Sequence, residues 1–185
     1  MVDQNTMESV TGAANATGGA DSVSGGKSQS PAVPTVLMGA QYVRSVTFNA
    51  LDSALIHTRP PVRPNTAMTL DVLARQVAEN RPEFEVDVVL NCVGRADAPV
   101  EGGEGAVLFE TQITYSGMFS LRNATAETLE PLLLVEAPKM LFPAVRNYLA
   151  DLTREAGFLP VIIQHVDFLA LWHSRRQQTQ NNTAG

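Results

Sequence analysis

Alternating apolar and polar residues predict β-strands in the first half of the ordered sequence, which begins near Val36. The clearest case is residues 84–92, where every second side chain is apolar. One face of this strand is therefore expected to be buried and the other mostly in contact with water. The same two-residue period runs through residues 42–48 and 107–115. Short, turn-rich connections favour antiparallel pairing of these strands.

The region between residues 51 and 76 is less regular. Three prolines lie between residues 51 and 65. Because proline lacks a backbone donor and disfavours helix in the residue before it, we expect a long irregular crossover loop here. Residues 68–72 alternate and predict another strand, although residues 73–79 also fit a helix.

Helical periodicity replaces alternation after the fourth predicted strand. Thr125 is expected to cap a first helix, which carries leucines at three- and four-residue spacing and which Pro138 is expected to end. A second helix is predicted from Leu141, with Pro143 in its first turn and Gly157 closing it.

A last helix is predicted after an extended segment at residues 158–163, and Asp167 can act as its N-cap. Strands come first in the chain and helices second. This order indicates an α+β domain with a four-stranded antiparallel sheet and C-terminal helices packed on one face.

Composition divides the chain into three parts. Residues 1–34 are rich in Ser, Gly, Ala and Asn, and they offer too little apolar area to offset the entropy lost on ordering. We expect a disordered N-terminal tail there. Residues 35–175 are expected to form the folded domain, and residues 176–185 a flexible polar C-terminal tail.

The overall composition indicates a protein that binds other proteins. Hydrophobic residues make up 44% of the chain and charged residues only 17%, so some apolar surface is expected to contact another protein surface. The net charge of −6 argues against nucleic acid as a partner, because phosphate binding needs clustered Lys and Arg. Cys92 is the one cysteine, which excludes an intrachain disulfide and a multi-thiolate metal site and fits a reducing compartment.

We also expect no direct insertion into a membrane. The first residues lack the basic and apolar regions of a signal peptide. The chain contains no run of about 18 apolar residues, the length that a helix needs to span a bilayer. A cytoplasmic protein is therefore expected.

No group of residues indicates catalysis. His57, His165 and His173 have no spacing that would place two of them on one metal ion. We place Glu85 and Asp87 on opposite faces of their strand, which would prevent them from forming an acid/base pair. We therefore expect no enzymatic activity, no metal and no cofactor.

Four parts of the sequence resemble the SecB family. They are residues 41–49 (QYVRSVTFN), residues 117–121 (GMFSL), residues 137–146 (APKMLFPAVR), and residues 157–160 with 166–172 (GFLP and VDFLALW). Together they cover about residues 36–178. The resemblance implies a SecB-like fold and a homotetramer built as a dimer of dimers. It also implies an ATP-independent chaperone that holds unfolded precursor proteins and passes them to the export motor SecA.

The resemblance also assigns roles to individual residues. The client-binding groove would contain Met68, Leu70, Ile162 and Trp172. Packing within the subunit and between subunits would fall to Leu141, Phe142, Pro143, Arg146 and Tyr148.

The outer face of the sheet, where the family usually presents acidic residues to SecA, departs from the family pattern. The matching positions are Ser45, Asn49, Glu110 and Gln112. An alternative acidic patch could combine Glu110 with Asp71 and with Glu85 or Asp87, although a solvated sheet face explains these acids equally well.

Two alternative functions remain open at this point. The first is a SecB-like chaperone dedicated to a single client such as an antitoxin, which the weakened acidic face motivates. The second is a small-molecule-binding or catalytic α+β domain. That domain would need convergent polar residues, and the sequence does not show them.

Overall fold

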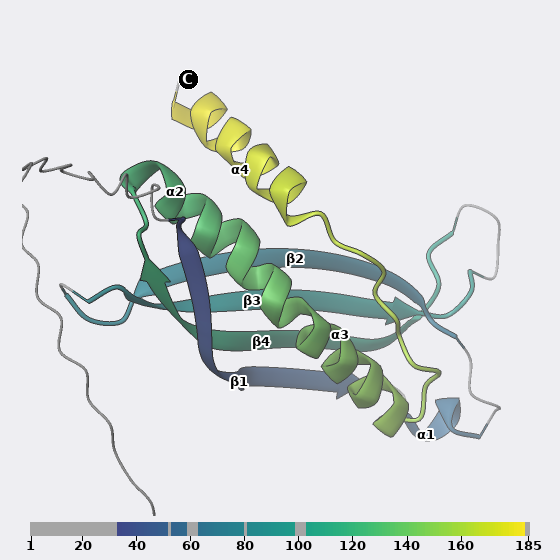
Figure 1. Cartoon of the computed structure of the whole chain (residues 1–185). Coiled ribbons are helices and arrows are strands. Elements are labelled where there is room, and N and C mark those ends of the chain that lie inside the picture. The colour runs from purple at the N-terminus through teal and green to yellow at the C-terminus, as the bar shows by residue number, and fades with distance from the viewer. Residues whose placement is uncertain (1–32, 52, 59–62, 80, 99–102, 184–185) are drawn as a thin grey trace, which may run out of the picture. The chain divides into compact units, whose positions relative to one another are not determined.

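The computed structural model describes residues 33–51, 53–58, 63–79, 81–98 and 103–183. The expected disordered tail falls almost entirely on residues 1–32, which lie outside the described residues and leave that prediction untested. Four long strands and a helical C-terminal half follow one another along the chain (Figure 1).

The four strands form one antiparallel sheet in the order β1-β4-β3-β2. They span Thr35–Ala50 (β1), Asn65–Gln76 (β2), Glu83–Arg95 (β3) and Val107–Arg122 (β4). Strands β1 and β2 are therefore the two edges. This arrangement and the helices that follow confirm the predicted α+β class.

The structure shows the conformation of two segments that the sequence left open or predicted only as a loop. Strand β2 continues to Gln76, so the alternative helix at residues 73–79 is wrong. The segment expected to be an irregular loop contains a short helix, α1 (Ser53–Ile56), which follows shortly after the end of β1.

The core lies between one face of the sheet and helix α3 (Ala137–Glu155) (Figure 1). The predicted buried face of β3 is confirmed, because Val86, Val88, Leu90 and Cys92 have almost no exposed surface. Helix α3 presents a four-residue repeat to them. Full burial of each such aliphatic side chain stabilises the fold by roughly 1.5–3 kcal/mol.

A glycine sets how closely helix and sheet approach. A Cβ atom on Gly117 of β4 would lie 2.6 Å from Cδ2 of Leu141 and 2.9 Å from the ring of Phe119. Neither distance is compatible with ordinary van der Waals contact. The absence of a side chain at Gly117 therefore lets Leu141 pack directly on the sheet.

The first two predicted helices are one continuous helical run. It consists of α2 (Ala126–Pro131), the π-helix η1 (Leu132–Glu136) and α3. Pro138, expected to end the first helix, lies in the first turn of α3, and Pro143, expected in a first turn, lies inside α3. Both expectations were wrong. The wider π turn, in which the backbone N–H of Ala137 bonds to the carbonyl of Leu132, relieves the clash that a proline ring makes in a regular helix.

The predicted helix-end residues are confirmed. Thr125 accepts a hydrogen bond from the backbone N–H of Thr128 at the start of α2, and Gly157 follows α3 with a φ of +87°. Asp167 caps α4 (Phe168–Thr183) by accepting from the N–H of Ala170 at 3.0 Å. This helix continues through residues 176–183, where a flexible tail was expected.

Candidate protein-binding surfaces

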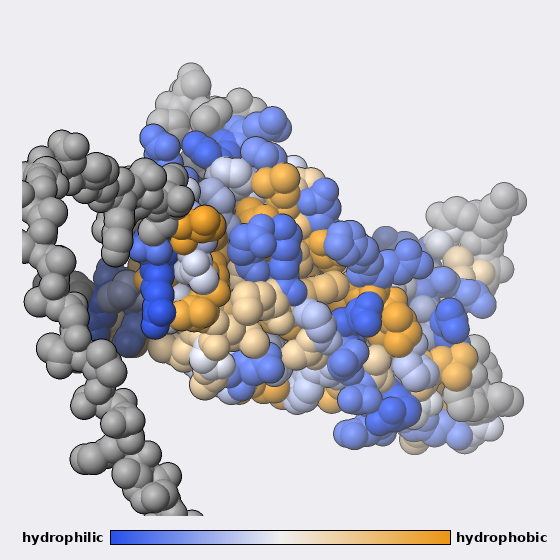
Figure 2. All heavy atoms as spheres, viewed as in Figure 1, coloured by the Kyte–Doolittle hydropathy of each residue, from blue (hydrophilic) through white to orange (hydrophobic). Residues whose placement is uncertain are grey.

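The four residues expected to form a client groove lie on one side of the molecule but are not equally placed. Met68 and Leu70 of β2 pair with Cys92 and Leu90, so they occupy the helix-covered face at the sheet edge. Met68 is exposed and Leu70 half-buried. Figure 2 shows hydrophobic residues scattered among hydrophilic ones on this side of the molecule.

Trp172 of α4 lies beside β2. It borders a narrow crevice with Val72 of β2, Leu134 of η1 and two residues of its own helix. Ile162 lies in the connection between α3 and α4 and is 63% exposed, although Val161 and Ile163 on either side of it are buried. The structure therefore brings Trp172 to the edge strand and leaves Ile162 open to a partner.

A second hollow, of about 290 Å³, also borders Trp172. It is lined by Glu130, Leu134, Trp172, Arg175, Arg176 and Thr179. The indole N–H of Trp172 donates to Oε1 of Glu130 at 2.9 Å, and the guanidinium of Arg176 lies 5.0 Å from the centre of the Trp172 ring. The tryptophan is therefore held between an acid and a cation.

The residues assigned to the SecA-contact face lie on the side of the sheet opposite the helices. Asn49 pairs with Glu110 across β1 and β4, and Ser45 pairs with Thr114. Asn49, Glu110 and Gln112 line one polar hollow of about 360 Å³. Ser45 lies further along β1 and does not border it.

Neutral side chains cross this outer face as a row of hydrogen bonds. The amide of Gln112 donates to Oδ1 of Asn91 at 2.9 Å, and the amide of Asn91 donates to Thr69 at 3.3 Å. The row connects β4, β3 and β2. Much of the hydrogen-bonding capacity of this face is therefore satisfied within the sheet.

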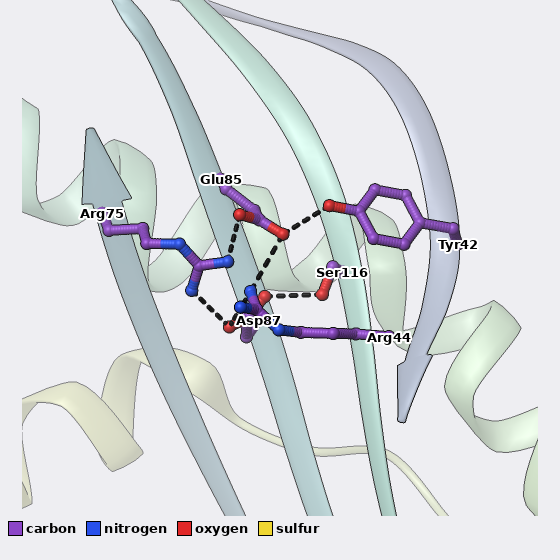
Figure 3. A network of polar contacts seen from close by, with 6 residues as sticks. All are labelled: Tyr42, Arg44, Arg75, Glu85, Asp87 and Ser116. Carbon is purple, nitrogen blue, oxygen red and sulfur yellow. Dashed lines mark hydrogen bonds and ion pairs between the residues drawn. The ribbon is translucent and has the colours of Figure 1, made fainter. Parts of the chain in front are cut away.

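A network of charges occupies the same face nearer the other end of β3 (Figure 3). Nη1 of Arg44 lies 3.1 Å from Oε1 of Glu85 and 3.3 Å from Oδ2 of Asp87. Arg75 contacts both carboxylates as well, with Nη1 2.9 Å from Asp87. Ser116 donates to Oδ1 of Asp87 at 2.6 Å. Two arginines thus neutralise two acids.

The ion pairs on this face correct three of our expectations. Glu85 and Asp87 are two residues apart and therefore share a face, so their placement on opposite faces was wrong. Asp87 is only 3% exposed, so this face of β3 is less wetted than expected. Both acids are ion-paired, as is Asp71 with Arg175, which removes the proposed acidic patch. Within the described part of the chain, no Lys or Arg pairs with Glu110.

Hydrogen bonding shifts the pKa values of Tyr42 and Glu85 in this network. The hydroxyl of Tyr42 donates to Glu85, and this bond, together with Arg75, lowers the pKa of the Glu85 carboxyl below its ordinary value. The same hydrogen bond raises the pKa of Tyr42. Both shifts favour a Glu85 that stays charged.

A β-bulge brings the network together. The register between β1 and β4 shifts between Val43 and Ser45, which inserts Arg44 as an extra residue. Sequence analysis missed this network. The two-residue spacing of Glu85 and Asp87 could have placed both acids on one face, but the bulge has no signal in the alternation pattern.

The five residues assigned to packing divide into two groups. Leu141 is fully buried and Phe142 nearly so, with its ring 5.6 Å from that of Phe168 in an edge-to-face contact. Pro143 and Arg146 are exposed, and Tyr148 is half-buried. Phe142, Pro143 and Arg146 border a hollow of about 370 Å³, which is completed by Lys139, His165, Val166 and Phe168.

The described residues show no arrangement for metal chemistry, because no group of three or more His, Cys, Asp or Glu side chains is suitably placed among them. Cys92 is 1% exposed, and burial raises the pKa of its thiol to about 11. The thiol therefore stays protonated, as expected of a small buried apolar residue. Among the same described residues, no helix has the length and apolar character needed to cross a membrane.

Comparison with known proteins identifies the family. The chain is 39% identical over 153 residues to the protein-export protein SecB of Granulibacter bethesdensis, covering 82% of this chain and 88% of the relative. It is 33% identical over 166 residues to protein-export protein SecB 1 of Gluconobacter oxydans, covering 89% and 95% of the two chains.

A solved structure is also similar to this chain in fold. A SecB-like chaperone from Mycobacterium tuberculosis, in complex with a peptide from an antitoxin, superposes with a TM-score of 0.57 at 12% identity, covering 71% of this chain and 90% of that one. Residues 29–179 match the family model of the preprotein translocase subunit SecB. The chain therefore belongs to the SecB family.

Proposed function

We propose that this protein is an ATP-independent holdase that binds unfolded precursor proteins in the cytoplasm, keeps them competent for translocation and delivers them to SecA. The observation that supports this proposal best is the match of residues 29–179 to SecB, together with export-protein relatives that cover most of the chain. The function requires binding surfaces and no chemical step.

Clients are proposed to bind along β2 and α4. Met68, Leu70, Ile162 and Trp172 supply adaptable apolar contacts, and the free edge of β2 supplies backbone groups. A chaperone that accepts many sequences benefits from backbone pairing, because such pairing does not depend on the side chains of the client.

The subunits are proposed to assemble as a homotetramer, a dimer of dimers. Pro143 and Arg146 lie on α3 away from its fully buried stripe, near exposed Met140, whereas Tyr148 is half-buried against the core. The exposed parts of these side chains are proposed to contact another subunit. A tetramer would have four times the chain mass of 19.9 kDa. Repeated grooves on one assembly would bind a long unfolded client with avidity.

SecA is proposed to dock on the outer sheet face that contains Ser45, Asn49, Glu110 and Gln112. Because the arginines neutralise Glu85 and Asp87, Glu110 carries most of the remaining negative charge there. We expect Glu110→Ala to weaken SecA binding and to reduce its dependence on salt, whereas Gln112→Ala changes affinity without changing the salt dependence. Equal salt dependence in wild type and Glu110→Ala would contradict this docking mode.

The general function is tested by light scattering and by aggregation assays. The expected result is a tetramer that suppresses aggregation of an unfolded protein without ATP and binds SecA. A stable monomer without this activity would contradict the proposal. Capture of one dominant client, with no binding to SecA, would instead favour the dedicated antitoxin-type chaperone. That reading has weaker support, because its solved example is only 12% identical.

A further inference from the structure

One arginine of α4 reaches the free edge of the sheet. Nη1 of Arg175 donates to the backbone carbonyl of Val72 at 3.0 Å, and Nη2 forms an ion pair with Asp71. Oδ1 of Asp71 also accepts the backbone N–H of Val72 at 2.6 Å. We call these three residues, Asp71, Val72 and Arg175, the edge clasp.

The edge clasp occupies the backbone groups that an added strand would use. Strand β2 is a sheet edge, and an extended peptide binds such an edge by exchanging hydrogen bonds with its outward N–H and C=O groups. At Val72 both groups already have side-chain partners. An incoming segment cannot pair at this residue while Arg175 remains in place.

The clasp also lies where α4 has few other attachments. The helix begins with Phe168, which is buried in the core, while Leu171 and Trp172 are half-buried. From His173 onward its sequence is polar. The outer part of α4 can therefore leave β2 by breaking the clasp without exposing a large apolar area.

We infer that the edge clasp is an autoinhibitory contact, which closes the β2 edge in the unloaded protein and which a client segment must displace. This inference rests on the proposed client-binding function. Such a contact would protect an unpaired sheet edge, to which strands of other chains can bind, while no client is present. It also makes client affinity dependent on the strength of one ion pair.

The clasp is partly solvated, since the side chains of Arg175 and Asp71 are 34% and 45% exposed. Exposed or partly exposed ion pairs are weak, so opening the clasp is expected to tighten client binding by about fivefold. A residue that contacts the client directly would behave in the opposite way, because its removal weakens binding.

Binding and opening of the clasp are followed by the fluorescence of Trp172. It is the one tryptophan of the chain, and it lines the same hollow as Arg175. The probe is reduced, carboxymethylated ribonuclease A, an unfolded chain that lacks tryptophan. Arg175→Gln and Asp71→Asn each remove one charge of the clasp, and the second substitution keeps an acceptor for the N–H of Val72. Arg154→Gln, which breaks an exposed ion pair at the end of α3, is the matched control.

We expect both clasp variants to bind the probe about fivefold more tightly than wild type, with the double variant gaining little more because the two residues act together. Before the probe is added, Trp172 emission in these variants is expected to shift to longer wavelength. Arg154→Gln is expected to match wild type. Equal or weaker binding by Arg175→Gln would overturn the inference.

The same experiment separates failure of the inference from failure of the proposed function. If no form binds unfolded protein, the holdase function is refuted. The clasp is then judged by Trp172 emission and by hydrogen exchange of the Val72 amide, which are expected to differ between Arg175→Gln and wild type. Identical values would show that the clasp does not hold α4 on β2.

Discussion

Replacement of Asp87 by Asn tests how strongly the charge network stabilises the sheet. The Oδ1 atom would still accept the hydrogen bond of Ser116. The Oδ2 position, which now faces Arg44 and Arg75 at 3.3 and 2.9 Å, would become an amide donor facing two cations. The substitution therefore removes two charge-assisted hydrogen bonds while it preserves shape.

The exposure of the partners limits the size of the effect. Breaking a fully buried ion pair costs about 3–5 kcal/mol, because the remaining charge stays desolvated. Arg44 and Arg75 are 44% and 43% exposed, so water can solvate them after the change. We therefore expect Asp87→Asn to lower the free energy of unfolding by about 2 kcal/mol, which corresponds to about 6 °C in Tm for a domain of this size.

Urea unfolding followed by circular dichroism measures this loss, at two protein concentrations because subunit association contributes to stability. Asp151→Asn is the control, since its ion pair with Arg154 has side chains that are 56% and 61% exposed. We expect that control to lose less than about 0.5 kcal/mol. Equal losses in the two variants would refute the view that burial of Asp87 makes its network stronger than a surface pair.

Three further predictions concern acidity and packing. Because the folded-state pKa of Glu85 is lowered, its stabilisation is fully present above the usual Glu value of about 4.3 and is lost as pH falls through the folded pKa. Urea midpoints of wild type and Glu85→Gln are therefore expected to converge below about pH 4, and a constant difference down to acid pH would contradict this. Gly117→Ala is expected to cost about 1–3 kcal/mol because its Cβ would clash with Leu141, whereas in Gly39→Ala the nearest atom lies at 3.5 Å and the same urea assay is expected to show a much smaller loss. Cys92 is expected to react with iodoacetamide at pH 8 only after unfolding, as checked by mass spectrometry with and without urea, and rapid labelling of the native protein would show that the thiol is accessible.

Strand β3 could be predicted from sequence because it buries one face almost completely. Val86 and Val88 must be apolar to pack under α3, and the polar residue between them, Asp87, marks the other face. The helix caps at Thr125 and Asp167 were predictable for a similar reason, since a cap depends on residues only three positions apart.

Features that depend on register or on distant segments were not predictable in this way. Pro138 and Pro143 were both expected to lie at the ends of separate helices, and the π turn that precedes Pro138 and joins these helices has no local signal. The bulge at Arg44 and the reach of Arg175 to Val72 depend on contacts between residues far apart in the chain. The groove assignments of Met68 and Ile162 came from resemblance and remain a proposal.

The π-helical segment Leu132–Glu136 has a consequence for how the length of this chain can vary. In a regular helix each residue turns the chain by about 100°, so a single deletion within α2 would rotate the end of β4 relative to the buried stripe of α3. The π turn already holds one residue more than a regular turn, so a single deletion in η1 would restore a regular turn without that rotation. One-residue deletions among relatives are therefore expected to be tolerated at η1 and in the loops but not within α2, whose length fixes the angle between the end of the sheet and the helix that covers it.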